Sequence, residues 1–468
     1  MSAGIRMNVV TGRTFRVASV GMSLLMAIGV LAMPLAPAIQ AQEQTQEPRE
    51  LGVALDRAIN SQEHLGTALR PVPDRIIRDQ ANAAKLVQLV NGWDLETALT
   101  RLEGTSQLAI SIGLMTNAFG DPIVAKLRSD TQVQYLKFAD AMIGDPQPEN
   151  NRDLVFLLQW LAAGNTESGA DRVIRAAKAG IGTDEPLWPI VFDPYSTDSP
   201  QARRVLDALA DPIPPGMIGL GILECANGLS LGGVEFHHPF DSDAGAELLA
   251  GWLGRKDDAS SSEAQSATAA LPFIKHARRN ELLQLAVDHP HPLVKAEAGW
   301  ALVMLEDQRG IRLLQAVCRD VRYSVTAQIY LEELEAADQI PAECKDDDFA
   351  VRAEFCHFLS LPDQLGEPPA EISLVGSQVL VWPPTGDRRR MSVVRFKYVD
   401  EDGGVLQEGV GVVGSLLAWL PDLTNVEMSG GDVLAIHCCY ELRAKGAANA
   451  PDKIDAATGL ALIRAAQR

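Results

Sequence analysis

The sequence lacks several short motifs that most directly reveal a chemical activity. It has no phosphate-cradling glycine loop, no His-Glu-x-x-His and no Cys-x-x-Cys, so motif evidence for nucleotide binding, zinc-protease or thiol-redox chemistry is missing. Aromatic residues make up only 5% of the chain while hydrophobic residues reach 47%. A globular core must therefore come mainly from alanine, leucine and valine. Because no catalytic motif is recognised, a non-enzyme is favoured, and an enzyme stays open as the alternative.

Cysteine is also scarce. Six cysteines in 468 residues are too few for a fold held together by a disulfide framework. Cys344 and Cys356 flank a change in composition and are candidates for one bridge, with buried free thiols as the alternative. No Asn-x-Ser/Thr site is present, so eukaryotic N-glycosylation is not supported.

Basic residues are in deficit. The chain has 41 Lys and Arg against 61 Asp and Glu, a formal net charge of -20. Such a chain is poorly suited to bind a phosphate backbone or an anionic membrane surface. We therefore expect no nucleic-acid or membrane partner; the charge favours a basic partner or simply serves solubility.

The first 41 residues have the three parts of a secretory signal. Arginines precede an apolar run from Val17 to Met33, and small-residue cleavage motifs end at Ala38 and Ala41. Residues 1–41 are predicted to be a cleaved signal peptide, with an uncleaved anchor as the alternative. The expected location is outside the cytoplasm, periplasmic or secreted, in a bacterial setting.

Amphipathic helical patterns follow from about residue 42 to 336, separated by Gly, Pro or Asp. Residues 42–200 do not align into clean units, so a divergent repeat array and an unrelated helical bundle both stay open. From residue 201 the pattern sharpens: the Leu-Leu-Gln at 282–284 recurs at 313–315, 31 residues later. That spacing is typical of a two-helix repeat with short turns.

The clearest unit runs from Asp288 to Val317. Two prolines mark a turn, apolar residues then recur at three- and four-residue steps, and Gly310 separates this helix from a second apolar face. The unit resembles the HEAT-like repeat of the phycobilisome-lyase type. The matching features are the turn Asp288-x-Pro290, the run 294–298, Ala301-Leu302 and 307–311. The resemblance implies a mainly α fold with a HEAT-like α-solenoid over 201–345, and almost nothing about activity.

The character of the chain changes near residue 345. An acidic run and three prolines over 346–370 predict a linker. Alternating apolar residues then predict strands at 372–382, 391–399, 405–413 and 433–443, with a hairpin turn at 400–404 and a helix from Asp452. Residues 371–468 are thus predicted to be a small α+β domain with an antiparallel sheet.

Two groups of side chains are candidate ligands or catalytic groups. The loop that holds His237, His238, Asp241 and Asp243 has the donors that metal ions use, but its aspartates are also placed to cap the next helix. On the predicted strand 433–443, one face would hold three further candidates, which are His437, Cys439 and Glu441. A capped loop and a partly covered polar strand face are the alternatives.

Three consecutive arginines, Arg388 to Arg390, are unusual in an acidic chain. They could bind an acidic partner, and a solvent-exposed loop tip is the alternative. No cofactor and no catalytic residue is predicted. The favoured hypothesis is an exported scaffold that binds a protein or peptide. The alternative is an enzyme or a small-molecule or metal binder, with its site in the 237–243 loop or the C-terminal domain.

Overall fold

The structure, a computed structural model, describes residues 50–468 except 73, 258–259, 362–363, 401 and 421–427. The predicted signal peptide over 1–41 lies outside the described residues. The described residues divide into two compact units, the first over 50–255 with 262–282 and the second over 256–261 with 283–468. In the described ranges, no helix has both the length and the apolar composition needed to cross a bilayer.

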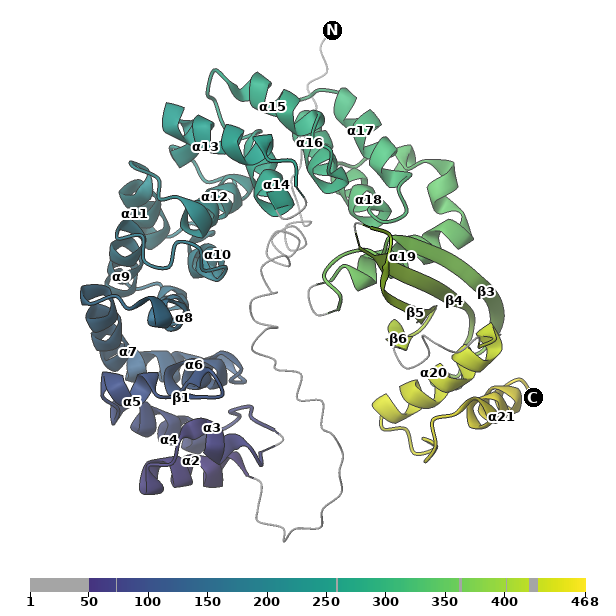
Figure 1. Cartoon of the computed structure of the whole chain (residues 1–468), viewed down its shortest axis with the longest axis horizontal. Coiled ribbons are helices and arrows are strands. Elements are labelled where there is room, and N and C mark those ends of the chain that lie inside the picture. Colours follow the sequence, from purple (N-terminus) through teal and green to yellow (C-terminus); the bar gives the residue numbers. More distant parts are fainter. Residues whose placement is uncertain (1–49, 73, 258–259, 362–363, 401, 421–427) are drawn as a thin grey trace. The chain divides into compact units, whose positions relative to one another are not determined.

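The first unit consists of helices and one short hairpin (Figure 1). Its elements are α2 (Leu51–Ser61), α3 (Leu65–Leu69), α4 (Gln80–Asn91), α5 (Leu95–Leu99), β1 (Arg101–Leu102), β2 (Thr105–Ser106), α6 (Gln107–Thr116), α7 (Asp121–Gly144), η1 (Pro148–Asn150), α8 (Asn151–Ala163), α9 (Glu167–Lys178), α10 (Trp188–Phe192), η2 (Asp193–Tyr195), α11 (Pro200–Leu209), α12 (Gly216–Leu231), η3 (Pro239–Asp241) and α13 (Asp243–Gly254). The unit boundaries fall at α14 (Ser261–Ala270) and α15 (Arg279–Val287).

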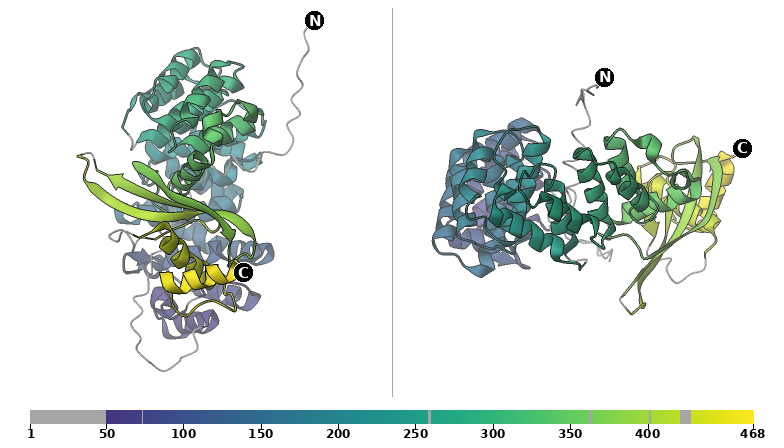
Figure 2. Two further views of the ribbon diagram at one scale, coloured as in Figure 1. Left: turned by 90° about the vertical axis from the view of Figure 1, so that its right-hand side faces the viewer. Right: turned by 90° about the horizontal axis from the view of Figure 1, so that it is seen from above.

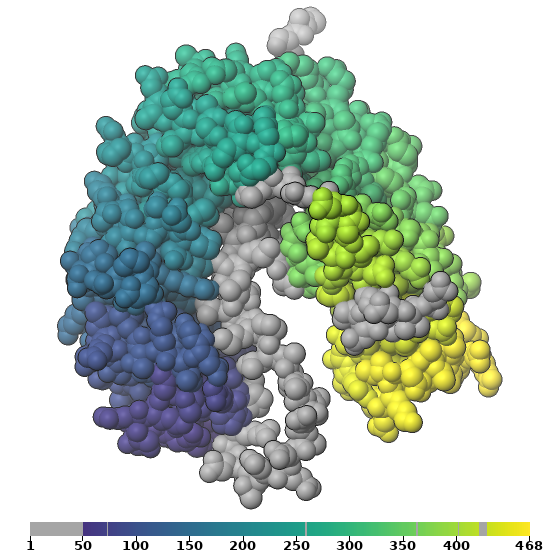
Figure 3. Space-filling model, viewed as in Figure 1, coloured from purple at the N-terminus to yellow at the C-terminus, as the bar shows by residue number. Residues whose placement is uncertain are grey.

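The helices of the first unit contact one another in two rows. One row runs α2, α4, α7, α9 and α11, and the other runs α3, α6, α8, α10 and α12. Contacts of α7 with α8, α8 with α9 and α11 with α12 join the rows. Successive segments of this unit accordingly lie side by side on its surface (Figure 3). Each helix therefore buries its apolar face against neighbours that follow it in the sequence.

Short polar side chains fix where several of these helices begin. Asp79, Asp94, Ser106, Thr166 and Ser199 each accept a hydrogen bond from the backbone N–H three residues later. Such a bond satisfies a donor that the first helical turn leaves unpaired. The turns between helices are thus set by local sequence.

The second unit begins with helices and ends with a sheet. Its elements are α16 (Pro292–Met304), α17 (Arg309–Cys318), α18 (Ser324–Glu333), η5 (Ala337–Gln339), η6 (Ala342–Lys345), α19 (Asp347–Leu359), β3 (Glu371–Val381), β4 (Arg388–Val399), β5 (Val405–Val413), β6 (Ala418–Leu420), α20 (Gly430–Ala444) and α21 (Ala456–Ala466). The helix pair predicted over 288–317 is confirmed as α16 and α17.

Two glycines allow α16 and α17 to approach closely. A Cβ atom on Gly310 would lie 2.2 Å from the carbonyl oxygen of Gly299 and 2.7 Å from Cγ2 of Val303. Both distances are shorter than van der Waals contact, so only glycine fits at residue 310. Gly310, the second residue of α17, therefore sets the separation of the pair.

The sheet is antiparallel, with strand order β3-β4-β5-β6. The predicted hairpin at 400–404 is confirmed, because β4 and β5 pair on either side of it. Phe355 and Leu359 of α19 pack against one face, and Val433, Leu434 and other residues of α20 pack against the opposite face. Figure 2 shows α20 and α21 together on one side of the twisted sheet. The small domain is therefore a sheet covered on both faces.

The open edge of β3 has one side-chain partner. The amide of Gln467 accepts a hydrogen bond from the Val381 backbone N–H (3.0 Å) and donates one to the Val381 carbonyl (2.8 Å). The side chain thus takes the place of a peptide group on a neighbouring strand.

Two predictions for this unit need correction. Residues 433–443, predicted as a strand, lie in α20, because their buried positions recur every four residues (Val433, His437 and Glu441) and Ser429 caps the helix by accepting from the Asp432 N–H. Residues 347–359, placed in a predicted linker over 346–370, form α19, whose start is capped by Asp346. The helix predicted from Asp452 is confirmed but begins later, as α21.

Candidate functional site

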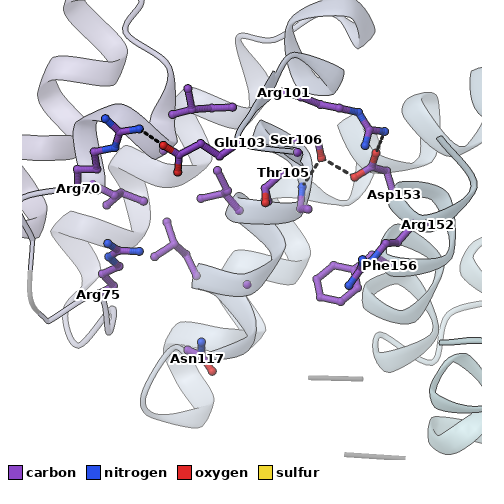
Figure 4. A pocket seen from close by; sticks show the side chains of 18 residues that line it. Arg70, Arg75, Arg101, Glu103, Thr105, Ser106, Asn117, Arg152, Asp153 and Phe156 are labelled. Atoms are coloured by element: carbon purple, nitrogen blue, oxygen red, sulfur yellow. Dashed lines mark hydrogen bonds and ion pairs between the residues drawn. The ribbon is translucent and has the colours of Figure 1, made fainter. Parts of the chain in front are cut away.

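A cavity of about 740 Å³ lies in the first unit, between α3, the β1–β2 hairpin, α6 and the start of α8. Four arginines line it, so we call it the arginine pocket: Arg70, Arg75, Arg101 and Arg152. In Figure 4, Arg70 and Arg75 lie on one side of the cavity and Arg101 and Arg152 on the other. The pocket therefore has basic groups on opposite walls.

The hairpin that forms one wall depends on a two-residue turn. Glu103 and Gly104 both have positive φ, 53° and 81°, as the tight turn of a two-residue hairpin requires. Register pairs Arg101 with Ser106 and Leu102 with Thr105. The turn thus presents Arg101 and Glu103 at the rim of the pocket.

Asp153, in the first turn of α8, joins the hairpin to the helix. Its Oδ1 accepts a hydrogen bond from the Ser106 hydroxyl (2.5 Å) and its Oδ2 pairs with Arg101 Nη2 (2.5 Å). Arg101 Nη2 also lies 2.6 Å from the Glu149 carbonyl oxygen. Burial raises the pKa of Asp153, against the opposing effects of Ser106 and Arg101. This network holds Arg101 in a fixed position.

The charges of the pocket do not balance. Its two carboxylates are both paired, Glu103 with Arg70 and Asp153 with Arg101. Arg75 donates from Nε to the Val72 carbonyl oxygen (3.2 Å). Neither Arg75 nor Arg152 forms an ion pair in the described part of the chain, although the charge of Arg152 opposes the rise that burial causes in the pKa of Asp153. The lining therefore has a formal charge of +2, four arginines minus two carboxylates, within a chain of charge -20.

Apolar side chains form the rest of the lining. Leu69, Leu114 and Phe156 are buried, and Leu102 and Ile110 are partly buried. A pocket of this volume, with apolar walls and a few polar groups, has the general form of a ligand site. The arrangement can bind an organic anion that also carries an apolar group.

The 237–243 loop does not bring its candidate ligands together. His237 is exposed, whereas His238 is buried, accepts from the Phe240 N–H, and has its pKa lowered by burial to about 4. Asp241 accepts from the Lys275 N–H and Asp243 contacts His276 (2.9 Å). Neither aspartate caps α13, because Ser242 does. In the residues that the structure describes, no cluster of metal-ligating side chains is found.

The second candidate group is split by the helix that replaces the predicted strand. His437 Nε2 and Glu441 Oε2 lie 3.7 Å apart on successive turns of α20, while the Cys439 thiol contacts the Asp455 carbonyl oxygen (3.8 Å) on the α21 side. Glu441 is fully buried and accepts hydrogen bonds from three side chains at 2.7 Å: Trp382, Ser415 and Lys445.

Burial lowers the pKa of His437 to about 4. Burial opposes ionisation of Glu441, but its three hydrogen-bond donors outweigh that effect and lower the pKa. The pair is therefore a neutral imidazole beside a charged carboxylate, both in the core under Trp382. Both side chains are fully buried, so the pair exposes no group for catalysis.

The remaining candidates from the sequence, the cysteines and the run of three arginines, are buried thiols and residues at the start of a strand. All six cysteines are buried free thiols, and Cys344 contacts the Cys318 carbonyl oxygen (3.2 Å) rather than forming the predicted bridge with Cys356. Arg388 to Arg390 begin β4, and Arg389 and Arg390 pair with Asp387 and Asp347.

Sequence reasoning missed two features. The first and last arginines of the pocket, Arg70 and Arg152, are 82 positions apart. Only the Glu-Gly turn at 103–104 signals the hairpin that lies between them in the pocket wall. The segment 228–232 reads Gly-Leu-Ser-Leu-Gly, the pattern of a nucleophile elbow. Ser230 lies within α12 instead of at a strand-to-helix turn, so no elbow forms.

No protein-family model, curated protein or solved structure matches this chain. The HEAT-like resemblance of 288–317 therefore rests on those residues alone. Function has to be argued from the pocket and from the helix arrangement.

Proposed function

We propose that this chain is an exported α-solenoid scaffold that binds a segment of a partner protein in the arginine pocket. The two rows of helices in the first unit, each contacting its successors in chain order, support a solenoid of helix pairs. In the second unit, α16 and α17 form a further helix pair. Helix arrays of this kind commonly serve as extended binding surfaces.

The single observation that carries the proposal is that Arg75 and Arg152, which form no ion pair in the described part of the chain, line a pocket with several apolar side chains. Both carboxylates of the pocket are paired with arginines, Glu103 with Arg70 and Asp153 with Arg101, so neither is free to act as a general base. None of its lining residues is His, Cys or Lys, and Ser106 is occupied by Asp153 and by the Ala109 N–H. Binding is therefore favoured over catalysis.

A photo-crosslinking amino acid at Asn117, which lines the pocket, tests the proposal. In cells that export the protein, it should give a covalent adduct with a partner polypeptide. The same amino acid at exposed Lys178, on α9 outside the pocket, is the control. The adduct should disappear in the Arg75→Ala/Arg152→Ala double variant. An adduct of equal yield from Lys178, or one that the double variant does not change, would contradict the proposal.

A second candidate function is binding of a small organic molecule in the same pocket, which its volume favours. In that case Asn117 would give no polypeptide adduct. A low-molecular-weight ligand would instead accompany the purified protein and be released on denaturation, as mass spectrometry would show.

A further inference from the structure

We infer that the arginine pocket recognises an acidic C-terminus: the free terminal carboxylate of a polypeptide, an apolar last side chain, and one acidic side chain just before it. This inference rests on the proposed function, in which the partner is a protein, and it names the part of the partner that binds.

The first step concerns charge. Arg70 and Arg101 are paired with Glu103 and Asp153, so the two arginines of the lining that form no ion pair in the described chain are Arg75 and Arg152. They stand on opposite sides of the cavity (Figure 4). A guanidinium group binds a carboxylate with two parallel hydrogen bonds. Two such groups on opposite walls fit a ligand with two carboxylates better than a ligand with one.

The second step concerns what lies between the arginines. Ile110 and Leu114 of α6, with Phe156 of α8, supply apolar surface to the same cavity. A side chain that fills this space must be apolar, because a polar one would lose its hydration without a partner. The ligand therefore combines two charges with an apolar group in one compact piece.

The third step concerns size. The cavity of about 740 Å³ accommodates a few residues but not a folded domain. At a chain end, the carboxylate and the last side chain leave the same Cα atom, so charge and apolar group are adjacent by construction. An internal acidic residue would need an exit for the chain in both directions. A chain terminus needs an exit in one direction only.

The fourth step concerns pre-organisation. Arg101 is held by Asp153 and the Glu149 carbonyl oxygen, and Nε of Arg75 is held by the Val72 carbonyl oxygen. Walls that are ordered before binding lower the entropic cost of association.

The test uses the full exported chain and a pool of hexapeptides, randomised at five positions and ending in leucine. One pool has a free carboxylate and the other a carboxamide. The immobilised protein should retain free-carboxylate peptides, enriched in Asp or Glu before the last residue, as read by mass spectrometry. Arg75→Ala and Arg152→Ala should each weaken binding of a retained peptide about tenfold. Arg312→Ala, an exposed arginine of α17, is the matched control and should leave it unchanged.

Three results would overturn the inference: equal retention of both pools, no enrichment in acidic residues, or retention that neither arginine variant weakens. N-acetyl-leucine that binds as tightly as the best peptide would also overturn it, in favour of a small organic acid. The crosslink from Asn117 separates this failure from that of the proposed function. A partner captured at the pocket through an internal segment keeps the scaffold and removes only the C-terminal specificity.

Discussion

Asp153 is the side chain at which the walls of the arginine pocket meet. It is buried, with 4% of its surface exposed, and joins β2 through Ser106 and β1 through Arg101. A carboxylate in this position stabilises the site only while its donors remain, because a buried charge without partners costs several kcal/mol.

Replacement of Asp153 with asparagine should therefore loosen the hairpin. We expect a loss of about 1 to 3 kcal/mol in the local free energy of opening, since the charged partner of Arg101 disappears. Hydrogen exchange of backbone amides at 101–109 and 151–157 measures it. Asp171→Asn removes the carboxylate of a half-exposed pair with Arg204 and should cost less than about 1 kcal/mol. Equal effects of the two variants would show that Asp153 does not join these walls.

His437 makes the C-terminal domain sensitive to acid. Its pKa falls from 6.5 to about 4 on burial, so the unfolded chain takes up this proton at a higher pH than the folded chain does. Stability should be constant above pH 6.5 and fall between pH 6.5 and 4, by up to about 3 kcal/mol. His437→Gln should reduce this dependence without abolishing it, because burial also lowers the pKa of His357 in the same fragment. Urea unfolding of residues 346–468 at several pH values measures the change. An unchanged slope would assign the acid sensitivity to other groups.

At the scale of elements, the close pair α16 and α17 depends on Gly310. Gly310→Ala should destabilise it by about 1 to 3 kcal/mol, because the new methyl group would overlap the Gly299 carbonyl oxygen. Gly251 in α13 is the control: nothing lies within 4 Å of an added Cβ, so Gly251→Ala should stabilise its helix by up to about 1 kcal/mol. Hydrogen exchange in each helix reports both effects. Tolerance of Gly310→Ala would mean that the helices can move apart at little cost.

The fold could be predicted where local sequence and burial agree. The 400–404 turn, rich in Asp and Gly, and the helix pair at 288–317 were both correct. The strand predicted over 433–443 is wrong. The alternation of Leu434, Ile436 and Cys438 indicates a strand, but Val433, His437 and Glu441 recur every four residues, as in a helix. The Ser429–Asp432 cap was the signal that favours a helix over a strand.

At the scale of the whole molecule, α19 belongs with the sheet. A fragment of residues 346–468 should fold alone, whereas 371–468, the domain that sequence alone predicts, should not. Without α19, Val394 and Phe396 on one sheet face would lose the cover of Phe355, at about 1.5 to 3 kcal/mol per large side chain. Circular dichroism and thermal unfolding of the two fragments compare them. A cooperative transition in the shorter one would show that α19 is dispensable.

The arginine pocket could not be predicted from local sequence patterns. Arg70, Arg75, Arg101 and Arg152 stand in four segments with no motif in common, and only tertiary contacts between α3, α6 and α8 bring them together. The net charge of -20 gives no sign of them either, because a sum over the chain hides a local surplus of the opposite sign.

The Gln467 side-chain amide also affects the tendency of the protein to self-associate. β3 is an outer strand with exposed Val375 and Val379, and such strands can recruit a neighbour's strand and start aggregation. At Val381 both peptide groups are already taken by Gln467, which shortens the ladder that a second molecule could add. Gln467→Ala should therefore increase self-association in light scattering at high concentration, and an unchanged second virial coefficient would contradict this. The Gln467 side chain thus limits the addition of another strand at this end of β3.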